Sequence, residues 1–229
     1  MSRWRNCWRS PGVEPTNYSS CSETLSADPM RRISGPEIVI ATRNAGKLNE
    51  YRELLGEHDL TVISSFELGI PAPAECETTI SGNARLKALH AMRRCEFCVL
   101  AEDSGLEVDA LGGAPGVHSA DWAEGPDGRD YAAAMLRIRD SLHGVPEPHR
   151  ARFCAAICVA WPDGHTVQFS GEVRGAIVWP PRGTGGFGYD PVFCPDGSRR
   201  TFGEMTSREK NQTSHRSIAL GKFMQRCVL

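Results

Sequence analysis

A run of six residues, Thr42-Arg43-Asn44-Ala45-Gly46-Lys47, combines a hydroxyl, an amide and two cations directly after a short apolar stretch. If a helix begins there, its first free amides and its dipole favour an anion, and these side chains add donors and positive charge. The run therefore predicts a phosphate-binding turn, although it lacks the pattern of a Walker loop. The alternative, equally weighted on these six residues alone, is an ordinary helix start that Asn44 caps and in which Lys47 is solvated.

An acidic run, Glu102-Asp103-Ser104-Gly105-Leu106-Glu107-Val108-Asp109, directly follows the apolar segment 97–101. Ligands of open α/β sheets gather at the carboxyl ends of strands, so we expect these acids at such an end. Magnesium takes one or two protein carboxylates together with phosphate oxygens and water, which Asp103 and a second acid could supply. The alternative is a turn, which this run alone slightly favours, because Asp-Ser-Gly is common turn chemistry.

Two later segments are candidates for contact with a nucleotide base. Residues 183–191 embed Phe187 and Tyr189 in glycine-rich backbone, and an aromatic face stacked on a base contributes about 1–3 kcal/mol. The alternative is that both rings fill the core. Residues 210–216 place three potential cations just before the last expected helix; a solvated helix start capped by Ser214 is the alternative.

The elements that must position these residues follow an α/β pattern from residue 38 onward, because short β-branched runs alternate with segments of helical periodicity. The expected strands are 38–41, 97–101, 152–161 and 165–173, and the expected helices are centred on 48–55, 81–94, 131–142 and 220–227. The turn Pro162-Asp163-Gly164 joins the last two strands into a hairpin, which makes the sheet mixed. The long segment 180–216 is expected to be a functional loop region.

Composition limits the classes of function. The chain has 229 residues, 40% of them hydrophobic, and a formal net charge of -2. Without a basic stripe, we expect no polymeric nucleic acid as a partner. Since no stretch approaches the roughly 18 apolar residues of a membrane span and the start lacks a secretory apolar core, we expect no membrane partner and a cytoplasmic location.

The first 36 residues are rich in Ser, Pro and Arg and show no periodicity. We therefore expect a disordered extension over 1–36 and one domain over 37–229, and Met30 is a possible translation start. Cys95-Glu96-Phe97-Cys98 has the spacing of metal ligands, but no second pair at matching spacing completes a zinc site.

Together these segments resemble the inosine/xanthosine triphosphate pyrophosphatase family, which removes deaminated purine nucleotides. The resemblance covers about residues 38–227 in the family's order. Its motifs are Thr42 to Lys47, Asn83-Ala84-Arg85-Leu86-Lys87-Ala88, Asp103 to Gly116, Gly185-Gly186-Phe187-Gly188-Tyr189-Asp190-Pro191 and Ser214-His215-Arg216.

The resemblance implies an elongated mixed β-sheet flanked by helices, two lobes with a nucleotide cleft between them, and a homodimer. It implies Mg²⁺-dependent hydrolysis of ITP, dITP, XTP and dXTP to the monophosphate and pyrophosphate. Asp103 would be the catalytic carboxylate and a metal ligand, and Glu75 the second metal-site acid. The implied substrate-binding residues are Thr42, Arg43, Asn44, Ala45, Gly46, Lys47, Ser104, Phe187, Gly188, Tyr189, Asp190, Lys210, His215 and Arg216. Of these, Thr42, Asn44 and Lys47 would hold the triphosphate, aided by Ser104 and Lys210. Phe187 to Asp190 together with His215 and Arg216 would enclose the purine.

Three departures from the family pattern stand out. Gly82 replaces the usual Glu before Asn83, and Glu75-Cys76-Glu77 stands where the acid is usually followed by Thr-Gly, which leaves the choice between Glu75 and Glu77 open. Glu102 replaces the commoner Asp. Two alternatives also remain: a related pyrophosphatase that acts on other modified nucleotides, and a nucleotide-binding protein without catalysis.

Overall fold

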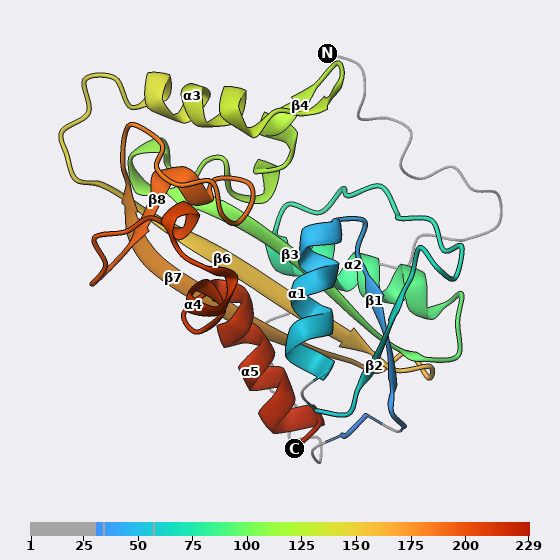
Figure 1. Ribbon diagram of the computed structural model, residues 1–229. Coiled ribbons are helices and arrows are strands. Elements are labelled where there is room, and N and C mark those ends of the chain that lie inside the picture. Colours follow the sequence, from blue (N-terminus) through green and yellow to red (C-terminus); the bar gives the residue numbers. More distant parts are fainter. Residues whose placement is uncertain (1–30, 34, 57) are drawn as a thin grey trace.

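A single six-stranded sheet with helices on both faces organises the chain (Figure 1). The computed structural model describes residues 31–33, 35–56 and 58–229. In order the elements are β1 (Glu37–Ala41), α1 (Ala45–Gly56), β2 (Thr61–Ser64), α2 (Ile80–Met92), β3 (Cys98–Val108), β4 (Glu124–Gly125), β5 (Gly128–Arg129), α3 (Tyr131–Ser141), β6 (His149–Ala160), β7 (Thr166–Ile177), β8 (Phe193–Pro195), α4 (Ser207–Asn211) and α5 (His215–Cys227). Short 3₁₀ turns lie between them, of which η2 (Gly116–His118) and η3 (Asp121–Ala123) matter below.

The strand order is β2-β1-β3-β6-β7-β8. β1 pairs in parallel with β2 and β3, whereas β3 to β8 pair antiparallel. The expected mixed α/β sheet is therefore confirmed, including the hairpin of β6 and β7. At its turn, Gly164 adopts a φ of 89°, in the left-handed region that favours glycine.

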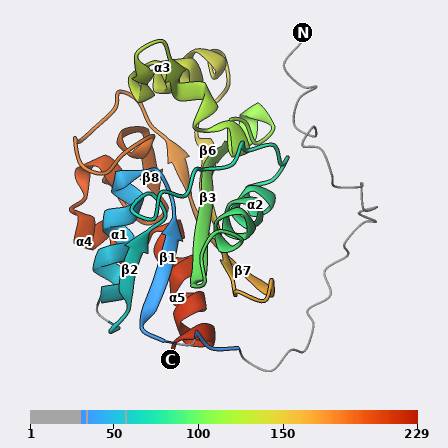
Figure 2. The ribbon, with the colours of Figure 1, turned by 90° about the vertical axis from the view of Figure 1, so that its right-hand side faces the viewer.

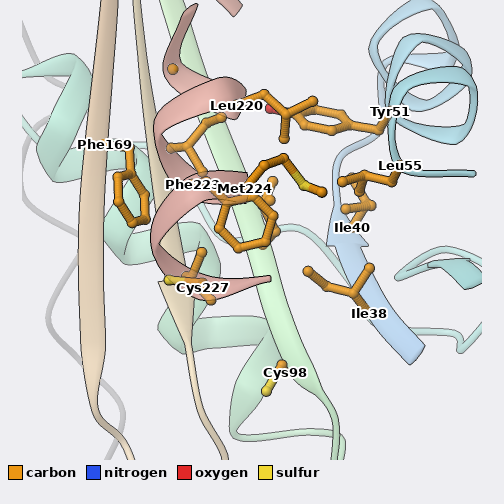
Figure 3. Packing of buried hydrophobic residues seen from close by; sticks show 14 of the residues in the cluster. Ile38, Ile40, Tyr51, Leu55, Cys98, Phe169, Leu220, Phe223, Met224 and Cys227 are labelled. Carbon is orange, nitrogen blue, oxygen red and sulfur yellow. The ribbon is translucent and has the colours of Figure 1, made fainter. Parts of the chain in front are cut away.

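Alternating side chains of β1 and β3 supply the apolar layers on both faces of the sheet. Ile40 and Leu100 join the side chains of α1 and α5 on one face, and Figure 3 shows side chains from β1, α1 and α5 pointing toward one another. Val39 and Val99 meet α2 on the other face, which Figure 2 shows on the opposite side of the sheet from α1. This double burial explains why β1 is an unbroken apolar run. A third apolar cluster lies under α3.

β3 is much longer than the expected strand 97–101, and the expectation that the acidic run lies beyond a strand's end is wrong. The strand continues to Val108 because β6 pairs with it throughout, so Asp103 lies opposite Ala156. Asp-Ser-Gly makes no turn here. Gly105 instead allows another segment to cross, because a Cβ there would lie 2.2 Å from the Gly116 carbonyl oxygen.

The parallel part of the sheet nevertheless ends where a site was expected. β1 stops at Ala41, which pairs with Ala101. Beyond Ala101, the edge of β3 that faces β1 has no pairing partner within the described residues until Glu107, which forms a bridge with Pro115. Asp103 and Ser104 thus lie on a stretch of strand that is open on one edge, at the carboxyl end of the parallel strands.

The packed region begins before residue 37. The Ile33 amide donates to the Cys227 carbonyl at 2.9 Å, and the Trp161 indole donates to the Arg32 carbonyl at 3.3 Å. Residues 31–33 therefore contact the fold although composition assigned them to the extension; residues 1–30 lie outside the described residues. In the described part of the chain, no helix has both the length and the apolar character that crossing a membrane requires.

Candidate active site

A pocket of about 780 Å³ opens at the edge where β1 ends. Its walls come from the start of α1, from α2, from the open stretch of β3, and from segments 70–78, 117–131 and 187–190. Residues of all four sequence motifs line it. The volume lies within the roughly 300–1,000 Å³ range of small-molecule sites.

The turn at the start of α1 caps the helix and also borders the pocket. The Asn44 Oδ1 atom accepts from the Lys47 amide at 3.1 Å, which is the capping role of the structural alternative. Lys47 is not solvated, however, because its Nζ donates to the Ser104 hydroxyl at 2.8 Å and lies 3.1 Å from the Glu102 carboxylate. Burial lowers the pKa of Lys47, against the opposing effect of Glu102.

Within this turn, Thr42, Arg43, Asn44 and Lys47 line the pocket. Ala45 and Gly46 are not part of that lining. Gly46 instead lies under the Phe187 ring, because a Cβ there would come 3.3 Å from Phe187 Cδ1. The expected phosphate-binding turn, residues 42–47, is therefore in contact with the segment expected to bind the base, residues 183–191, which we call the base segment.

Alternation along β3 sends neighbouring acids to opposite faces of the sheet. Glu102 points to the α1/α5 face, where it meets Lys47 and Arg216, whereas Asp103 points to the α2 face. The Lys87 Nζ atom lies 2.8 Å from Asp103 Oδ1 and 3.4 Å from a Glu75 oxygen. The other oxygen, Asp103 Oδ2, is buried with no hydrogen-bond partner within the described residues.

This carboxylate pair is compatible with magnesium. No group of three or more His, Cys, Asp or Glu side chains arranged to hold a metal occurs in residues 31–33, 35–56 and 58–229. Magnesium needs only one or two protein carboxylates when phosphate oxygens and water complete its shell. Asp103 Oδ2 and the Glu75 carboxylate, both near Lys87, supply that donor set.

The base segment is held by a buried ion pair. Asp190 accepts from the Phe187 amide at 2.8 Å and from Lys210 Nζ at 2.7 Å. Lys210 also lies over the Phe187 ring, 4.4 Å from its centroid. Burial raises the pKa of Asp190, while Lys210 opposes that rise. Phe187, Gly188, Asp190 and Lys210 all line the pocket, and so does buried Tyr189, whose hydroxyl donates to the Ser119 carbonyl at 2.8 Å.

His215 and Arg216 diverge, although the family resemblance gave both to the purine. His215 lines the pocket and stacks on Phe153 with ring centroids 4.9 Å apart. Burial, assisted by the charge of Arg216, lowers the pKa of His215 well below 6.5, so the imidazole is neutral at pH 7.

Arg216 lies behind the base segment and not in the pocket lining. Its side chain is 1% exposed and donates through Nε and Nη2 to Glu102, at 2.5 and 2.8 Å, and through Nη1 to Glu50. Burial raises the pKa of Glu102, but Arg216 and Lys47 outweigh it and hold that pKa well below 4.5. Adjacent residues at the start of a helix point in different directions, so Arg216 is not among the lining residues although His215 is. The contact of Arg216 with the purine stays a prediction.

Comparison with known proteins identifies the family of the chain. The Ham1 family pattern matches residues 38–226. The chain belongs to the Ham1 family. It is 46% identical over 212 residues to the dITP/XTP pyrophosphatase of Agrobacterium fabrum, covering 87% of this chain and 99% of the relative. It is 50% identical over 200 residues to that of Gluconobacter oxydans, covering 87% and 95%.

Solved Ham1 structures share the fold. A HAM1 protein from Coxiella burnetii superposes with a TM-score of 0.76 at 34% identity, covering 82% of this chain and 96% of that protein. The Staphylococcus aureus Ham1 protein gives a TM-score of 0.73 at 35% identity, with the same coverage.

Two departures from the Ham1 pattern fit each other in space. A Cβ on Gly82 would lie 2.8 Å from the Glu77 Cβ. The side chain of Glu77 thus takes up the space next to residue 82, and the loss of a side chain at 82 accompanies the gain of one at 77. Glu77 also lines the pocket, but only Glu75 comes within 4 Å of Lys87.

Lys87 also belongs to the site, although the sequence motifs predicted no role for it. It belongs to the Ham1 run Asn83 to Ala88, and it lies four residues after Asn83, whose side chain accepts from the Glu77 amide at 3.1 Å. This helical spacing places both side chains on one face of α2, toward the pocket. That spacing was the signal in the sequence that could have identified Lys87.

Proposed function

We propose that this chain hydrolyses ITP, dITP, XTP and dXTP to the nucleoside monophosphate and pyrophosphate. The observation that carries the proposal is the placement of Asp103. Asp103 lines the same pocket as residues of the expected phosphate-binding turn and of the base segment, and its Oδ2 atom has no hydrogen-bond partner within the described residues. The names of the Agrobacterium and Gluconobacter relatives support the same substrates.

In the proposed reaction water attacks the α-phosphorus and the bond to the bridging oxygen of the leaving pyrophosphate breaks. The Asp103 carboxylate accepts the proton of the attacking water, while Lys87 donates to its Oδ1 atom at 2.8 Å and fixes the carboxylate. Lys47 and the amides at the start of α1 neutralise charge that develops on the phosphate oxygens. Ser104 keeps Lys47 pointed into the pocket.

Asp103 and Glu75 are the residues that would hold Mg²⁺, with phosphate oxygens and water as its remaining ligands. Bound magnesium would neutralise phosphate charge during the transfer. Proximity to Lys87 favours Glu75 over Glu77 as the second acid.

Base selection falls to His215 in this proposal. One nitrogen of a neutral imidazole donates a hydrogen bond, and such a donor pairs with the 6-oxygen of hypoxanthine or xanthine but meets the amino group of adenine. Since a buried polar group left unpaired costs about 1–3 kcal/mol, one such contact gives about 5- to 150-fold discrimination.

The test is pyrophosphate release from ITP, XTP and ATP, with and without Mg²⁺. We expect magnesium-dependent turnover of ITP and XTP well above that of ATP. Asp103→Asn should fold normally and lose turnover by about 100-fold or more. The matched control is Asp109→Asn, an exposed acid of the same run outside the pocket lining. Wild-type turnover by Asp103→Asn would overturn the assignment.

We also infer that the pocket is a cleft between two lobes, that the enzyme is a homodimer, and that it acts on the cytoplasmic nucleotide pool. The apolar cluster under α3, which is separate from the clusters beside α1 and α2, supports the two lobes. Sedimentation velocity tests the dimer, and small-angle scattering with and without ITP tests closure of the lobes.

A further inference from the structure

The wall of the pocket formed by residues 117–131 has no part in the mechanism above. It comprises η2, η3, the β4–β5 hairpin and the first residue of α3. From this wall Val117 to Asp121, Glu124, Arg129 and Tyr131 line the pocket. Tyr131 is the one among them that contacts the base segment directly through a ring.

The backbone holds Tyr131 in place. Tyr131 is the first residue of α3, and Asp130 caps that helix by accepting from the Ala133 amide at 2.9 Å. The Asp130 amide in turn donates to the Ala123 carbonyl at 2.7 Å, which ties the helix start to η3. Tyr131 thus enters the pocket from an anchored position.

Two contacts place the Tyr131 ring against the base segment. Its centroid is 5.4 Å from that of Tyr189, with the ring planes at 86°. A Cβ on Gly188 would lie 3.6 Å from Tyr131 Cε1. The Tyr131 ring therefore borders Gly188, at van der Waals distance from the place where a side chain at this position would begin.

Tyr189 offers less ring surface to a base than Tyr131. It is 3% exposed, its hydroxyl donates to Ser119, and Tyr131 contacts its ring. Phe187 and Tyr131 are the partly buried rings that line the pocket next to Gly188. Tyr131 therefore adds an aromatic ring to the pocket wall beside the base segment.

We infer that Tyr131 is a substrate-binding residue that supplies a second aromatic surface for the purine, in addition to Phe187. The inference rests on the proposed function, since it assumes a purine at the base segment. Stacking on an aromatic ring tolerates every base, because every base has a π-face. Tyr131 therefore contributes affinity for the nucleotide, while the choice between keto and amino purines stays with the polar groups.

The experiment compares Tyr131→Ala and Tyr131→Phe with wild type in steady-state hydrolysis of ITP with Mg²⁺. Tyr131→Ala should raise KM by roughly 5- to 150-fold, the range for loss of one stacked base. Tyr131→Phe keeps the aromatic face and should stay close to wild type. Leu136→Ala, on the exposed side of the same helix, is the matched control and should leave KM unchanged.

A probe without a base separates stacking from a general disturbance of the pocket. Inorganic tripolyphosphate should inhibit wild type and Tyr131→Ala with equal inhibition constants, because Tyr131 acts on the base. An unchanged KM in folded Tyr131→Ala would overturn the inference. So would an equal loss of tripolyphosphate inhibition, since Tyr131 would then act on the phosphates or on pocket shape.

Two safeguards keep the inference testable. If Tyr131→Ala fails to fold, Tyr131→Leu retains apolar packing on Tyr189 without an aromatic face, and a wild-type KM in that variant overturns the inference. If wild type releases no pyrophosphate from ITP, the proposed function fails by itself. Calorimetric binding of ITP to wild type and Tyr131→Ala then decides the role of Tyr131, with equal affinities as the overturning result.

Discussion

Removing Arg216 should damage the stability of the protein before it damages selection of the base. The guanidinium is 1% exposed and pairs with Glu102, whose side chain is also 1% exposed. Loss of one partner of such a buried pair costs about 3–5 kcal/mol, because it leaves an uncompensated charge in the interior. After Arg216→Ala, Glu102 keeps the Tyr51 hydroxyl at 2.7 Å and Lys47 at 3.1 Å. We therefore expect the lower end, about 3 kcal/mol.

A loss of that size is measurable by urea denaturation, and it corresponds to a fall in Tm of roughly 6–12 °C for a domain of this size. Removing both charges should recover part of the loss, so we expect Arg216→Met with Glu102→Gln to be more stable than the sum of the two single effects. Activity toward ITP and ATP should decline together in Arg216→Ala, because the residue supports Phe187 from behind, 5.4 Å from its ring centroid.

The opposite pattern would refute this reasoning. If Arg216→Ala unfolds like wild type but loses kcat/KM for ITP by far more than for ATP, then Arg216 must reach the purine in the complex. The Glu102 ion pair would in that case break when substrate binds. His215→Ala provides the comparison. This variant lacks the proposed donor to the 6-oxygen, so the enzyme should lose its selectivity for ITP, but no buried ion pair is removed.

Three further predictions concern the fold. Gly105→Ala should lower the free energy of unfolding by about 1–3 kcal/mol or more, because the new methyl group would lie 2.2 Å from the Gly116 carbonyl oxygen; an unchanged melt would contradict that close approach. His215 becomes protonated below its ordinary pKa of 6.5 in the unfolded chain, but only at a much lower pH in the folded chain. The free energy of unfolding should therefore fall as the pH drops below 6.5. The slope is about 1.4 kcal/mol per pH unit, and urea titrations should show it flattened in His215→Phe. Deleting residues 1–29 should leave Tm and kcat/KM unchanged, since the segment that contacts α5 is retained; a large drop in either would show that the deleted residues contribute.

The sequence predicted those elements whose local pattern matches their final environment. β1 is buried on both faces and reads as a continuous apolar run, and the turn between β6 and β7 has a glycine where the backbone needs positive φ. β2, β8 and the β4–β5 hairpin were missed. They have only two to four residues per strand, so they form through pairing with neighbours and not through a pattern of their own.

The sequence predicted which segments form the site, but not in which directions their side chains point. The turn before α1 and the glycine-rich base segment both line the pocket, as their composition suggested. No sequence pattern says that Arg216 turns toward Glu102 while His215 lines the pocket. Nor did it show that the run around Asp103 would stay extended, because pairing with β6 overrides the turn preference of Asp-Ser-Gly.

Two acids stand on consecutive residues of β3, and consecutive residues of a strand point to opposite faces of the sheet. The position of each acid along the strand therefore decides its role. Glu102 is buried with Arg216 on the α1/α5 face, and Asp103 pairs with Lys87 on the α2 face. Exchanging the two side chains, Glu102→Asp together with Asp103→Glu, would give the longer acid to the lysine and the shorter acid to the arginine, with overall charge unchanged. Composition alone would not reveal such an exchange. Variants at the two positions therefore call for different assays: unfolding experiments at Glu102 and turnover at Asp103.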